Sequence, residues 1–299
     1  MLEELAIDLN NFQVIRLIGE GKYGKVYLIE NKETKQQYAA KVLQYDDEDY
    51  RENCLKSIEI MGELRHPTLV NLIGYSPVDF EGKSNITIIL DLATNGSLHK
   101  WIKNGNYSAT QKQIILVGIC AGMKILHSHS YMHRDIKPDN ILIDKDFHPC
   151  ITDYLLMEKY EPGKKYQENV GTPAYMAPEC FDTQDYGLLC DVYSFAILMY
   201  QVVTGNSKVY DAQKFKSIYH LVSLIRKGER PSFEVPVKSS IKELIENRFE
   251  KNHNELKEEI NKVKEKIDKI KSNEIKKQNE EVQNKQNEEI ETFFPQNDN

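Results

Sequence analysis

The sequence has few of the features that mark a secreted or organelle-targeted protein. Its 299 residues include five cysteines, an odd number, and none of them form a CxxC pair. A disulfide framework and a zinc site are therefore not expected, and a reducing compartment fits the composition best. The first ten residues carry three acidic side chains and no basic one, so no presequence is predicted. We expect a cytoplasmic protein.

Long hydrophobic runs and excess positive charge are also missing. The most apolar internal stretch, residues 114–126, is interrupted by Lys124. A helix that spans a bilayer needs about 20 apolar residues, so this stretch predicts a core helix. The net charge of -7 gives no electrostatic reason to expect nucleic acid binding. Hydrophobic residues make up 40% of the chain, which is enough for a substantial core and excludes a wholly disordered protein.

Strand-forming residues dominate the first part of the chain, and helical spacing dominates the rest. In one expected helix Leu55, Ile58 and Met61 recur every three residues. A β-rich part followed by an α-rich part predicts two lobes. The expected strands lie within 12–45, with a turn at 31–35, and at 85–90, and the expected helices lie at 49–64, 111–129 and 191–204 and from Ser239 onward.

The composition changes after about Arg248. From there to Ile290 the chain is mostly Glu, Lys, Asn and Gln, without glycine or proline. Two interpretations are open: a coiled coil that binds a second copy or a partner helix, or a single solvated helix with a narrow apolar stripe. The residues 294–299 are expected to be disordered. The apolar residues at heptad-like spacing are Phe249, Leu256, Ile260, Val263, Ile267 and Ile270.

A glycine-rich segment precedes a lysine on a predicted strand. The segment, at residues 19–26, reads Gly-Glu-Gly-Lys-Tyr-Gly-Lys-Val. Glycines let backbone N–H groups approach phosphate oxygens closely, although a structural hairpin explains the segment alone about as well. No helix follows the third glycine, which disfavours a dinucleotide fold. Lys41 lies downstream on the strand 38–42, where it can neutralise nucleotide phosphates, so together they favour a hairpin that covers phosphates.

A polar loop at residues 131–140 carries the strongest chemical signal. It reads Tyr-Met-His-Arg-Asp-Ile-Lys-Pro-Asp-Asn. Asp135 can accept a hydroxyl proton, Lys137 can neutralise a transferring phosphate and Asn140 can hold a metal ion, and phosphoryl transfer needs these groups. Asp153, which ends a short strand, offers a carboxylate suited to magnesium. The alternative interpretation is a polar turn without chemistry.

Two further segments complete a recognisable order of motifs. Residues 170–179 read Val-Gly-Thr-Pro-Ala-Tyr-Met-Ala-Pro-Glu, and residues 190–195 read Cys-Asp-Val-Tyr-Ser-Phe. With these motifs the chain resembles the eukaryotic protein kinase family from about Phe12 to about Arg248. We therefore expect an N-terminal extension at 1–11, a protein kinase domain at 12–248, a charged helical or coiled-coil tail at 249–293 and the end at 294–299.

Shorter features are similar to different groups within that family. Residues 96–98, Gly-Ser-Leu, and 191–195 look most like the tyrosine-kinase-like group. Lys137, two residues after Asp135, and Thr172 in the activation segment look like Ser/Thr specificity. The resemblance thus implies a tyrosine-kinase-like protein with a Ser/Thr-type catalytic loop.

The resemblance implies a bilobal α+β fold with a small β-rich N-lobe, a larger helical C-lobe and a charged C-terminal helix. It implies transfer of the γ-phosphate of ATP, with Mg²⁺, to Ser/Thr hydroxyls of protein substrates, and neither a nucleic acid nor a membrane partner. Asp135 and Lys137 would be catalytic, and Asn140 and Asp153 would bind the metal. The nucleotide would contact Ile18, Gly19, Glu20, Gly21, Lys22, Tyr23, Gly24, Val26, Ala39, Lys41, Leu90, Asp91 and Ala93.

The resemblance also implies supporting roles in the interior. Leu90 would be the gatekeeper, residues 91–93 the hinge that meets adenine, and Ala39 part of the roof of the adenine pocket. Asp191 would brace the catalytic loop by hydrogen bonds to its backbone. A regulatory stack of side chains would consist of Met61, Leu72, His133 and Tyr154.

The chain departs from the family pattern at several positions. Ser57 occupies the helical position where the family has a glutamate that pairs with the lysine equivalent to Lys41. Leu155 replaces the glycine of the Asp-Phe-Gly motif, which would strain the backbone if that position required a positive φ. The C-lobe looks short, and no arginine follows Arg248 to pair with Glu179. These departures keep a pseudokinase scaffold open as an alternative to an active kinase.

The activation segment lacks the hydroxyl that the family phosphorylates there. No serine or threonine occurs between Tyr154 and Val170. At the position of the family's phosphorylated residue the chain has Glu168, and we expect its carboxylate to pair with Arg134 in place of the phosphate. A solvated Glu168 without a partner is the alternative.

Overall fold

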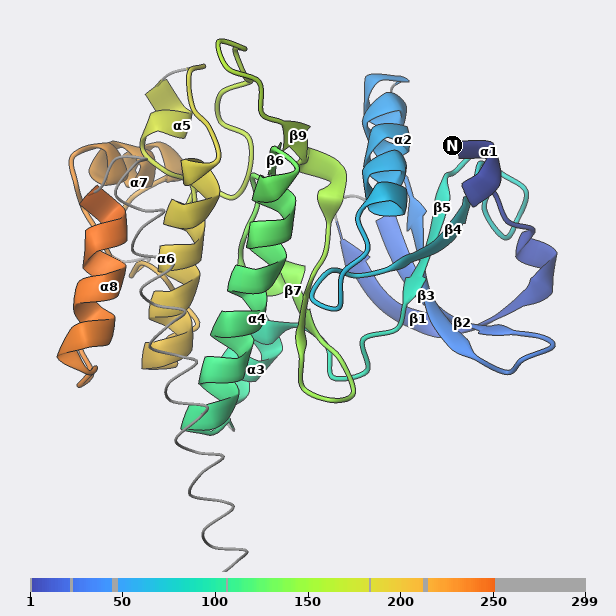
Figure 1. The fold of residues 1–299 in the computed structure, drawn as a ribbon, viewed down its shortest axis with the longest axis horizontal. Helices are drawn as coiled ribbons and strands as arrows, with labels where there is room; N and C mark the ends of the chain where they lie inside the picture. The colour runs from blue at the N-terminus through green and yellow to red at the C-terminus, as the bar shows by residue number, and fades with distance from the viewer. Residues whose placement is uncertain are drawn as a thin grey trace, which may run out of the picture. The chain divides into compact units, whose positions relative to one another are not determined.

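The N-terminal lobe is built on a five-stranded antiparallel sheet (Figure 1). The computed structural model describes residues 2–21, 24–44, 48–105, 107–182, 184–211 and 215–250. The sheet has the order β1-β2-β3-β5-β4, so that β1 and β4 form its edges. Its strands are β1 (Phe12–Gly21), β2 (Gly24–Asn31), β3 (Gln37–Leu43), β4 (Leu72–Ser76) and β5 (Thr87–Asp91).

The two faces of this sheet have different neighbours. Ile29, Ala40 and Ile89 form a buried cluster on one face, and apolar residues of the N-terminal segment pack against it. Because side chains alternate along a strand, Ala39 and Lys41 point to the opposite face. The sheet thus has one face covered by the N-terminal segment and an opposite face that carries Ala39 and Lys41.

A single helix, α2 (Glu48–Glu63), follows β3 in this lobe (Figure 1). Cys54, Ile58 and Met61 are buried and recur every three or four residues, so one stripe of the helix faces the lobe. The predicted helix over 49–64 is confirmed with a shift of one residue at each end.

The C-terminal lobe is mostly helical, as the sequence predicts. The predicted helices at 111–129 and 191–204 and the helix from Ser239 are confirmed. The helices are α3 (Leu98–Asn104), α4 (Ala109–Ser128), α5 (Glu179–Asp182), α6 (Leu189–Thr204), α7 (Ile218–Arg226) and α8 (Ser239–Glu250). Short strands separate some of them: β6 (Tyr131–Met132), β7 (Ile141–Ile143), β8 (Pro149–Ile151) and β9 (Glu158–Lys159). This lobe also contains the 3₁₀ turns η2 (Pro138–Asn140) and η3 (Tyr154–Leu156), whereas the turn η1 (Leu9–Asn11) precedes β1 in the N-terminal segment.

Two long helices organise the C-terminal lobe. All residues of α6 from Cys190 to Val202 are buried, so this helix forms the centre of the lobe. The α4 helix begins with a capping box, in which the Ser108 hydroxyl accepts the N–H of Gln111 and the Gln111 side chain accepts the N–H of Ser108. A β-rich N-lobe and a helical C-lobe confirm the predicted bilobal α+β fold.

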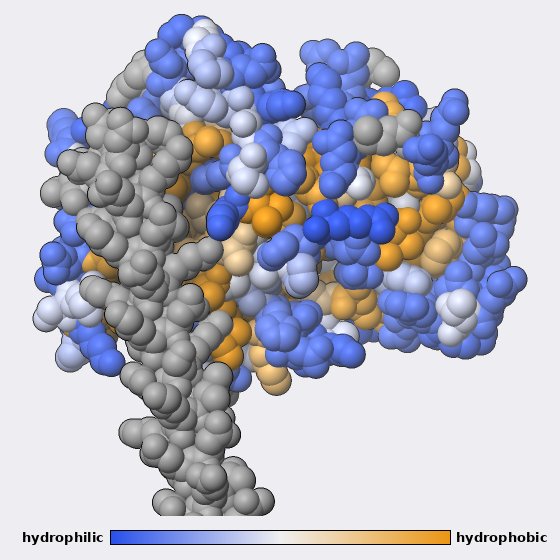
Figure 2. All heavy atoms as spheres, in the orientation of Figure 1, coloured by the Kyte–Doolittle hydropathy of each residue, from blue (hydrophilic) through white to orange (hydrophobic). Residues whose placement is uncertain are grey.

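Polar and apolar side chains alternate on the face of the domain that Figure 2 displays. Figure 2 shows apolar side chains in limited areas between hydrophilic ones on the face that it displays. In the part of the chain that the structure describes, no helix has the length and apolarity needed to cross a bilayer. The exposed large apolar side chains include Val14, Ile15 and Leu17 of the edge strand β1.

The compact unit of the chain extends from Met1 to Phe249. At its end the ring of Phe249 lies 5.5 Å from the ring of Tyr193 in α6. Arg248, the last arginine, is buried, with 6% of its surface exposed. The predicted heptad tail beyond α8 and the predicted disordered end lie outside the described residues.

Candidate active site

The register of the N-lobe sheet brings candidate nucleotide-binding residues to one face. Val26 of β2 is paired with Lys41 of β3, and Ala39 of β3 is paired with Leu90 of β5. Directly opposed residues of antiparallel strands point to the same face. Four predicted residues from three strands therefore line the inner face, with the hinge residue Asp91 at the end of β5. Among the remaining predicted positions, Ile18 is half-buried on β1, and Ala93 is half-buried beyond β5.

The surroundings of the three loop glycines differ, so the need for glycine differs from one position to the next. Gly24 has φ +135°, and a Cβ there would clash with the carbonyl oxygen of Val42. The pairing of β2 with β3 therefore requires glycine at this position. A Cβ on Gly21 would meet no atom within 4 Å, and one on Gly19 would only contact Val26 at 3.7 Å. Packing against the described residues does not require glycine at these two positions, and the open space there is compatible with the predicted approach of phosphate oxygens to the backbone. Lys22 and Tyr23 lie outside the described residues.

The catalytic loop gathers three donors around one carboxylate. Asp135 is 7% exposed. Its Oδ2 accepts hydrogen bonds from Lys137 Nζ at 2.6 Å and from Asn140 Nδ2 at 2.8 Å. Its Oδ1 accepts one from Thr172 Oγ1 at 2.7 Å, and Lys137 Nζ also donates to Thr172 at 2.7 Å. The loop and the activation segment are thereby joined at the predicted catalytic base.

A small hairpin places the two predicted metal ligands near each other. Strands β7 and β8 are paired, with Ile141 opposite Ile151. Beyond that pair the carbonyl of Asn140 accepts the N–H of Thr152 at 3.0 Å, so Asn140 and Asp153 flank the open end of the hairpin. The Asn140 amide nitrogen donates to Asp135, which leaves its side-chain oxygen as a ligand. An amide oxygen and a carboxylate are ligands that suit Mg²⁺, so these residues fit the ion that the family uses.

Lys41 and Asp153, which are 112 positions apart, form an ion pair of 2.7 Å between Nζ and Oδ1. Burial raises the pKa of Asp153, but the Lys41 ammonium outweighs it and holds the pKa below its ordinary value. Ser57 offers Lys41 no carboxylate from α2, as predicted, and Asp153 serves as the partner of Lys41 instead. Asp153 itself adopts the left-handed region, with φ 68° and ψ 70°, a conformation that costs on the order of 1–3 kcal/mol.

Ser57, at the family's glutamate position, faces the cleft. It is 4% exposed, and its single O–H is shared between two carbonyl acceptors, that of Tyr154 at 2.9 Å and that of Asn53 at 2.8 Å. From this position α2 therefore makes a neutral hydrogen bond to the backbone of Tyr154, whereas the family's glutamate makes a charged pair with the lysine equivalent to Lys41.

The substitutions in the Asp-Tyr-Leu motif are accommodated without strain at Leu155. Leu155 lies in η3 and is absent from the residues with positive φ, so the condition under which leucine would strain the backbone is not met. The Tyr154 ring lies 6.0 Å from the His133 ring in an edge-to-face arrangement, so two of the four members of the predicted stack are in contact. The Tyr154 hydroxyl donates to the carbonyl of Ile151 at 2.9 Å, which satisfies the group that phenylalanine lacks.

Asp191 braces the catalytic loop from the centre of the C-lobe. Its carboxylate is fully buried and accepts the N–H groups of His133 and Arg134, both at 2.8 Å, and lies 2.9 Å from His127 Nε2. Burial raises the pKa of Asp191, yet the hydrogen bond and charge of His127 keep it below its ordinary value. The predicted bracing contacts to the backbone are present.

Arg134 pairs with a carboxylate other than the predicted one. Its NH2 group lies 3.6 Å from Glu158 Oε2, and its Nε donates to the carbonyl of Leu156 at 2.5 Å. Within the described residues no ion pair joins it to Glu168, so that prediction is wrong. Lys164 also contacts Glu158, at 3.1 Å. A cavity of about 640 Å³ lies beside these groups, between α2 and the activation segment.

Two contributing residues were not among the predicted site residues. Thr172 was noted as a feature of the activation segment, but its bond to Asp135 depends on how that segment folds back. Nothing in the sequence indicated that Glu158 contributes to the site, because it is one of many acidic residues and no motif includes it. Glu158 lies 24 positions from Arg134, and Thr172 lies 37 positions from Asp135.

Comparison with known proteins identifies the family. The family model described as protein kinase domain matches residues 12–256, most of the chain. The chain belongs to the protein kinase family. Within this kinase domain, the matched region contains every group described above, from the glycine loop to the brace of the catalytic loop.

Serine/threonine kinases are among the relatives of this kinase domain. The serine/threonine-protein kinase AtPK1/AtPK6 of Arabidopsis thaliana is 32% identical over 204 residues, covering 67% of this chain and 43% of the relative. Serine/threonine-protein kinase 32C of Mus musculus is 30% identical, covering 73% and 46%. A RAC family serine/threonine-protein kinase homolog of Dictyostelium discoideum is 30% identical, covering 82% and 55%. The chain thus spans about half the length of these curated relatives.

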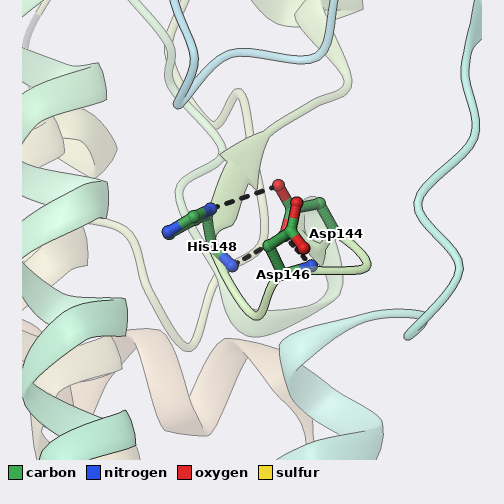
Figure 3. Close-up of side chains that lie close together, drawn as sticks. All are labelled: Asp144, Asp146 and His148. Carbon is green, nitrogen blue, oxygen red and sulfur yellow. Dashed lines mark hydrogen bonds and ion pairs between the residues drawn. The ribbon is translucent and has the colours of Figure 1, made fainter.

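One acidic cluster of the kinase domain lies outside the cleft. Asp144, Asp146 and His148 come together in the turn between β7 and β8, with potential ligand atoms within 4.8 Å of one another (Figure 3). Asp144 Oδ1 accepts the N–H groups of Asp146 and His148, both at 2.8 Å. These bonds close the turn and account for the cluster as local structure.

Proposed function

We propose that this kinase domain transfers the γ-phosphate of ATP to serine or threonine hydroxyls of protein substrates. The observation that supports this function most directly is the Asp135 carboxylate, which is nearly buried and accepts hydrogen bonds from Lys137, Asn140 and Thr172. It is a base placed beside a cation, at the loop where a substrate hydroxyl would bind. The names of the relatives support serine and threonine as acceptors.

The residues divide the reaction between them. Asp135 accepts the proton as the substrate oxygen forms its bond to the γ-phosphorus and the bond to the bridging oxygen of ADP breaks. Lys137 neutralises charge on the transferring group, and Lys41 orients the phosphates. Asn140 and Asp153 would hold Mg²⁺, which supplies charge neutralisation on the phosphate oxygens when bound. Positioning and charge account for the catalysis, since phosphoryl transfer needs little covalent help from the protein.

The departures from the family pattern do not remove any of these groups. Lys41 has a carboxylate partner in Asp153, and Leu155 is unstrained. Both observations support an active enzyme over a nucleotide-binding scaffold. Assignment to the tyrosine-kinase-like group rests on residues 96–98 and 191–195 and is part of this proposal. A cytoplasmic location is also part of it, and the odd number of cysteines without a CxxC pair supports that location.

The test is radiolabelled phosphate transfer to a generic protein substrate. Lys41→Met is expected to abolish transfer and weaken nucleotide binding. Asp135→Asn is expected to abolish transfer while nucleotide affinity stays near the parental value, because the base acts on the hydroxyl. Lys227→Ala, which replaces an exposed lysine at the end of α7 in the C-lobe, is the control. Transfer at the parental rate by both site variants would refute the assigned site, and an inactive parent that binds ATP would indicate a scaffold.

A further inference from the structure

The segment that precedes the kinase match is packed into the N-lobe. Within residues 2–11, which the family model does not cover, Leu2, Leu5, Ile7 and Leu9 are half-buried and the residues between them are mostly exposed. The N–H of Ile7 donates to the carbonyl of Tyr75 at 2.9 Å, and Ala6 forms a parallel bridge with Tyr75. The segment therefore pairs with β4, an edge of the sheet.

The same segment contacts α2. Helix α1 (Leu2–Leu5) lies beside α2 and close to β4 in Figure 1. A Cβ on Gly62 of α2 would lie 2.7 Å from Leu5 Cδ1, and a Cβ on Gly74 of β4 would lie 2.5 Å from Ile7 Cγ2. The segment thus bridges the helix and the sheet at two points of very close approach.

Neither glycine is explained by its own backbone. Gly62 and Gly74 are not among the glycines with positive φ. Glycine is unfavourable relative to alanine inside a helix, and a glycine in a strand often marks close approach of another backbone. At both positions the neighbour that a Cβ would meet belongs to the segment, through Leu5 or Ile7. The sequence of the lobe is therefore matched to the presence of the N-terminal segment.

The position of α2 matters for the residues around Asp153, and at position 57 a neutral hydroxyl makes the contact where the family has a carboxylate. Ser57 replaces the glutamate, and its hydroxyl reaches the carbonyl of Tyr154, the residue after Asp153. Gly62 lies five residues further along, about 140° around the helix from Ser57. Packing of Leu5 on Gly62 therefore acts from a different side of α2 than the contact with the cleft.

We propose that residues 2–11 form a brace that holds α2 against the cleft, doing by packing what a carboxylate at position 57 does by charge. Leu5 and Ile7 are its positioning residues. Through Ser57 and Tyr154 the brace sets the backbone that carries Asp153, and through Asp153 it sets Lys41. The effect on catalysis rests on the proposed kinase activity, whereas the effect on α2 does not.

The test compares Leu5→Asp with Ala6→Asp in the full chain. Both variants add the same charge to the same segment, but the Leu5 side chain packs on α2 and the Ala6 side chain is exposed. Hydrogen exchange of residues 48–63 reports on α2 without requiring activity. Leu5→Asp is expected to speed this exchange at least about tenfold and to lower kcat by about 10- to 100-fold with little change in KM for the protein substrate. Ala6→Asp is expected to match the parent.

Three results would overturn the brace. They are unchanged exchange of α2 in Leu5→Asp, an equal effect of Ala6→Asp, or a lower Tm with an unchanged kcat well below that Tm. Adding Ser57→Glu to Leu5→Asp is expected to restore most of kcat, because a carboxylate there ties α2 to Lys41 directly. If Leu5→Asp does not fold, Gly62→Ala serves: its methyl displaces Leu5, and faster exchange of residues 2–11 is expected, whereas slower exchange would contradict the proposal. If the parent transfers no phosphate, the exchange data still decide the brace.

Discussion

Removal of the Glu158 carboxylate tests how this kinase domain orders its activation segment. Glu158 stands 3.6 Å from Arg134, whose side chain is only 10% exposed. At that separation and an effective dielectric near 20, two unit charges attract each other by on the order of 5 kcal/mol. The Glu158 side chain is 37% exposed, so screening and desolvation reduce the net value to about 1–2 kcal/mol.

Glu158→Gln keeps the shape of the side chain and removes the charge. A loss of about 1–2 kcal/mol shifts the equilibrium between the ordered and the disordered segment by about 5–30-fold. We expect phosphate transfer to fall by up to that factor, and hydrogen exchange of residues 158–171 to rise. The parental rate should also fall as salt is raised, while the variant is less sensitive, because only the parent has the ion pair to screen.

Glu168→Gln is the matched control, since it removes the same charge ten residues further along the same segment. It is expected to retain the parental rate. Both variants are made in bacteria and treated with phosphatase, so that phosphorylation of other residues does not contribute. A parental rate in Glu158→Gln, or an equal loss in Glu168→Gln, would refute the reasoning from the Arg134 contacts.

Three further predictions address the rest of the domain. Ser57→Glu should raise the transfer rate by up to about tenfold by bringing a carboxylate to Lys41; an unchanged rate would mean that Asp153 orients Lys41 sufficiently. Asp191→Asn should lower the unfolding free energy by about 2–4 kcal/mol at pH 7, because one of two buried N–H groups loses its acceptor. The pKa of Asp191 is depressed in the folded state, so the contribution of its carboxylate to the unfolding free energy is present above the ordinary pKa of 3.8 and is lost as the pH falls through the lower folded value. Denaturation at pH 7 and at pH 3 should therefore show that the difference in unfolding free energy between variant and parent shrinks in acid. If the heptad pattern mediates self-association, removal of the residues after Glu250 should lower the number of subunits per particle measured by sedimentation. A parent protein that is monomeric at high concentration would leave only binding of a partner helix as the role of the pattern.

The sequence could predict those parts of the site that lie close together along the chain. Asp135, Lys137 and Asn140 fall within six residues, so one short loop must bring them together. The spacing of Ile58 and Met61 determined the helix α2, because residues three or four apart share one face. The position of Ser57 came from the resemblance to the family, and in the structure its hydroxyl contacts the carbonyl of Tyr154, next to Asp153.

Contacts between distant residues were decided by the tertiary structure alone. The sequence named Lys41 and Asp153 as site residues but could not pair them, since each had many possible partners of opposite charge. Arg134 had several candidate carboxylates, and the path of the activation segment selected Glu158 over Glu168. The fit of Leu5 on Gly62 has no local pattern, because glycine in a helix shows its reason only when the neighbour that fills the space is known. Local periodicity is fixed by the geometry of the backbone, whereas the choice among distant partners depends on how the whole domain packs.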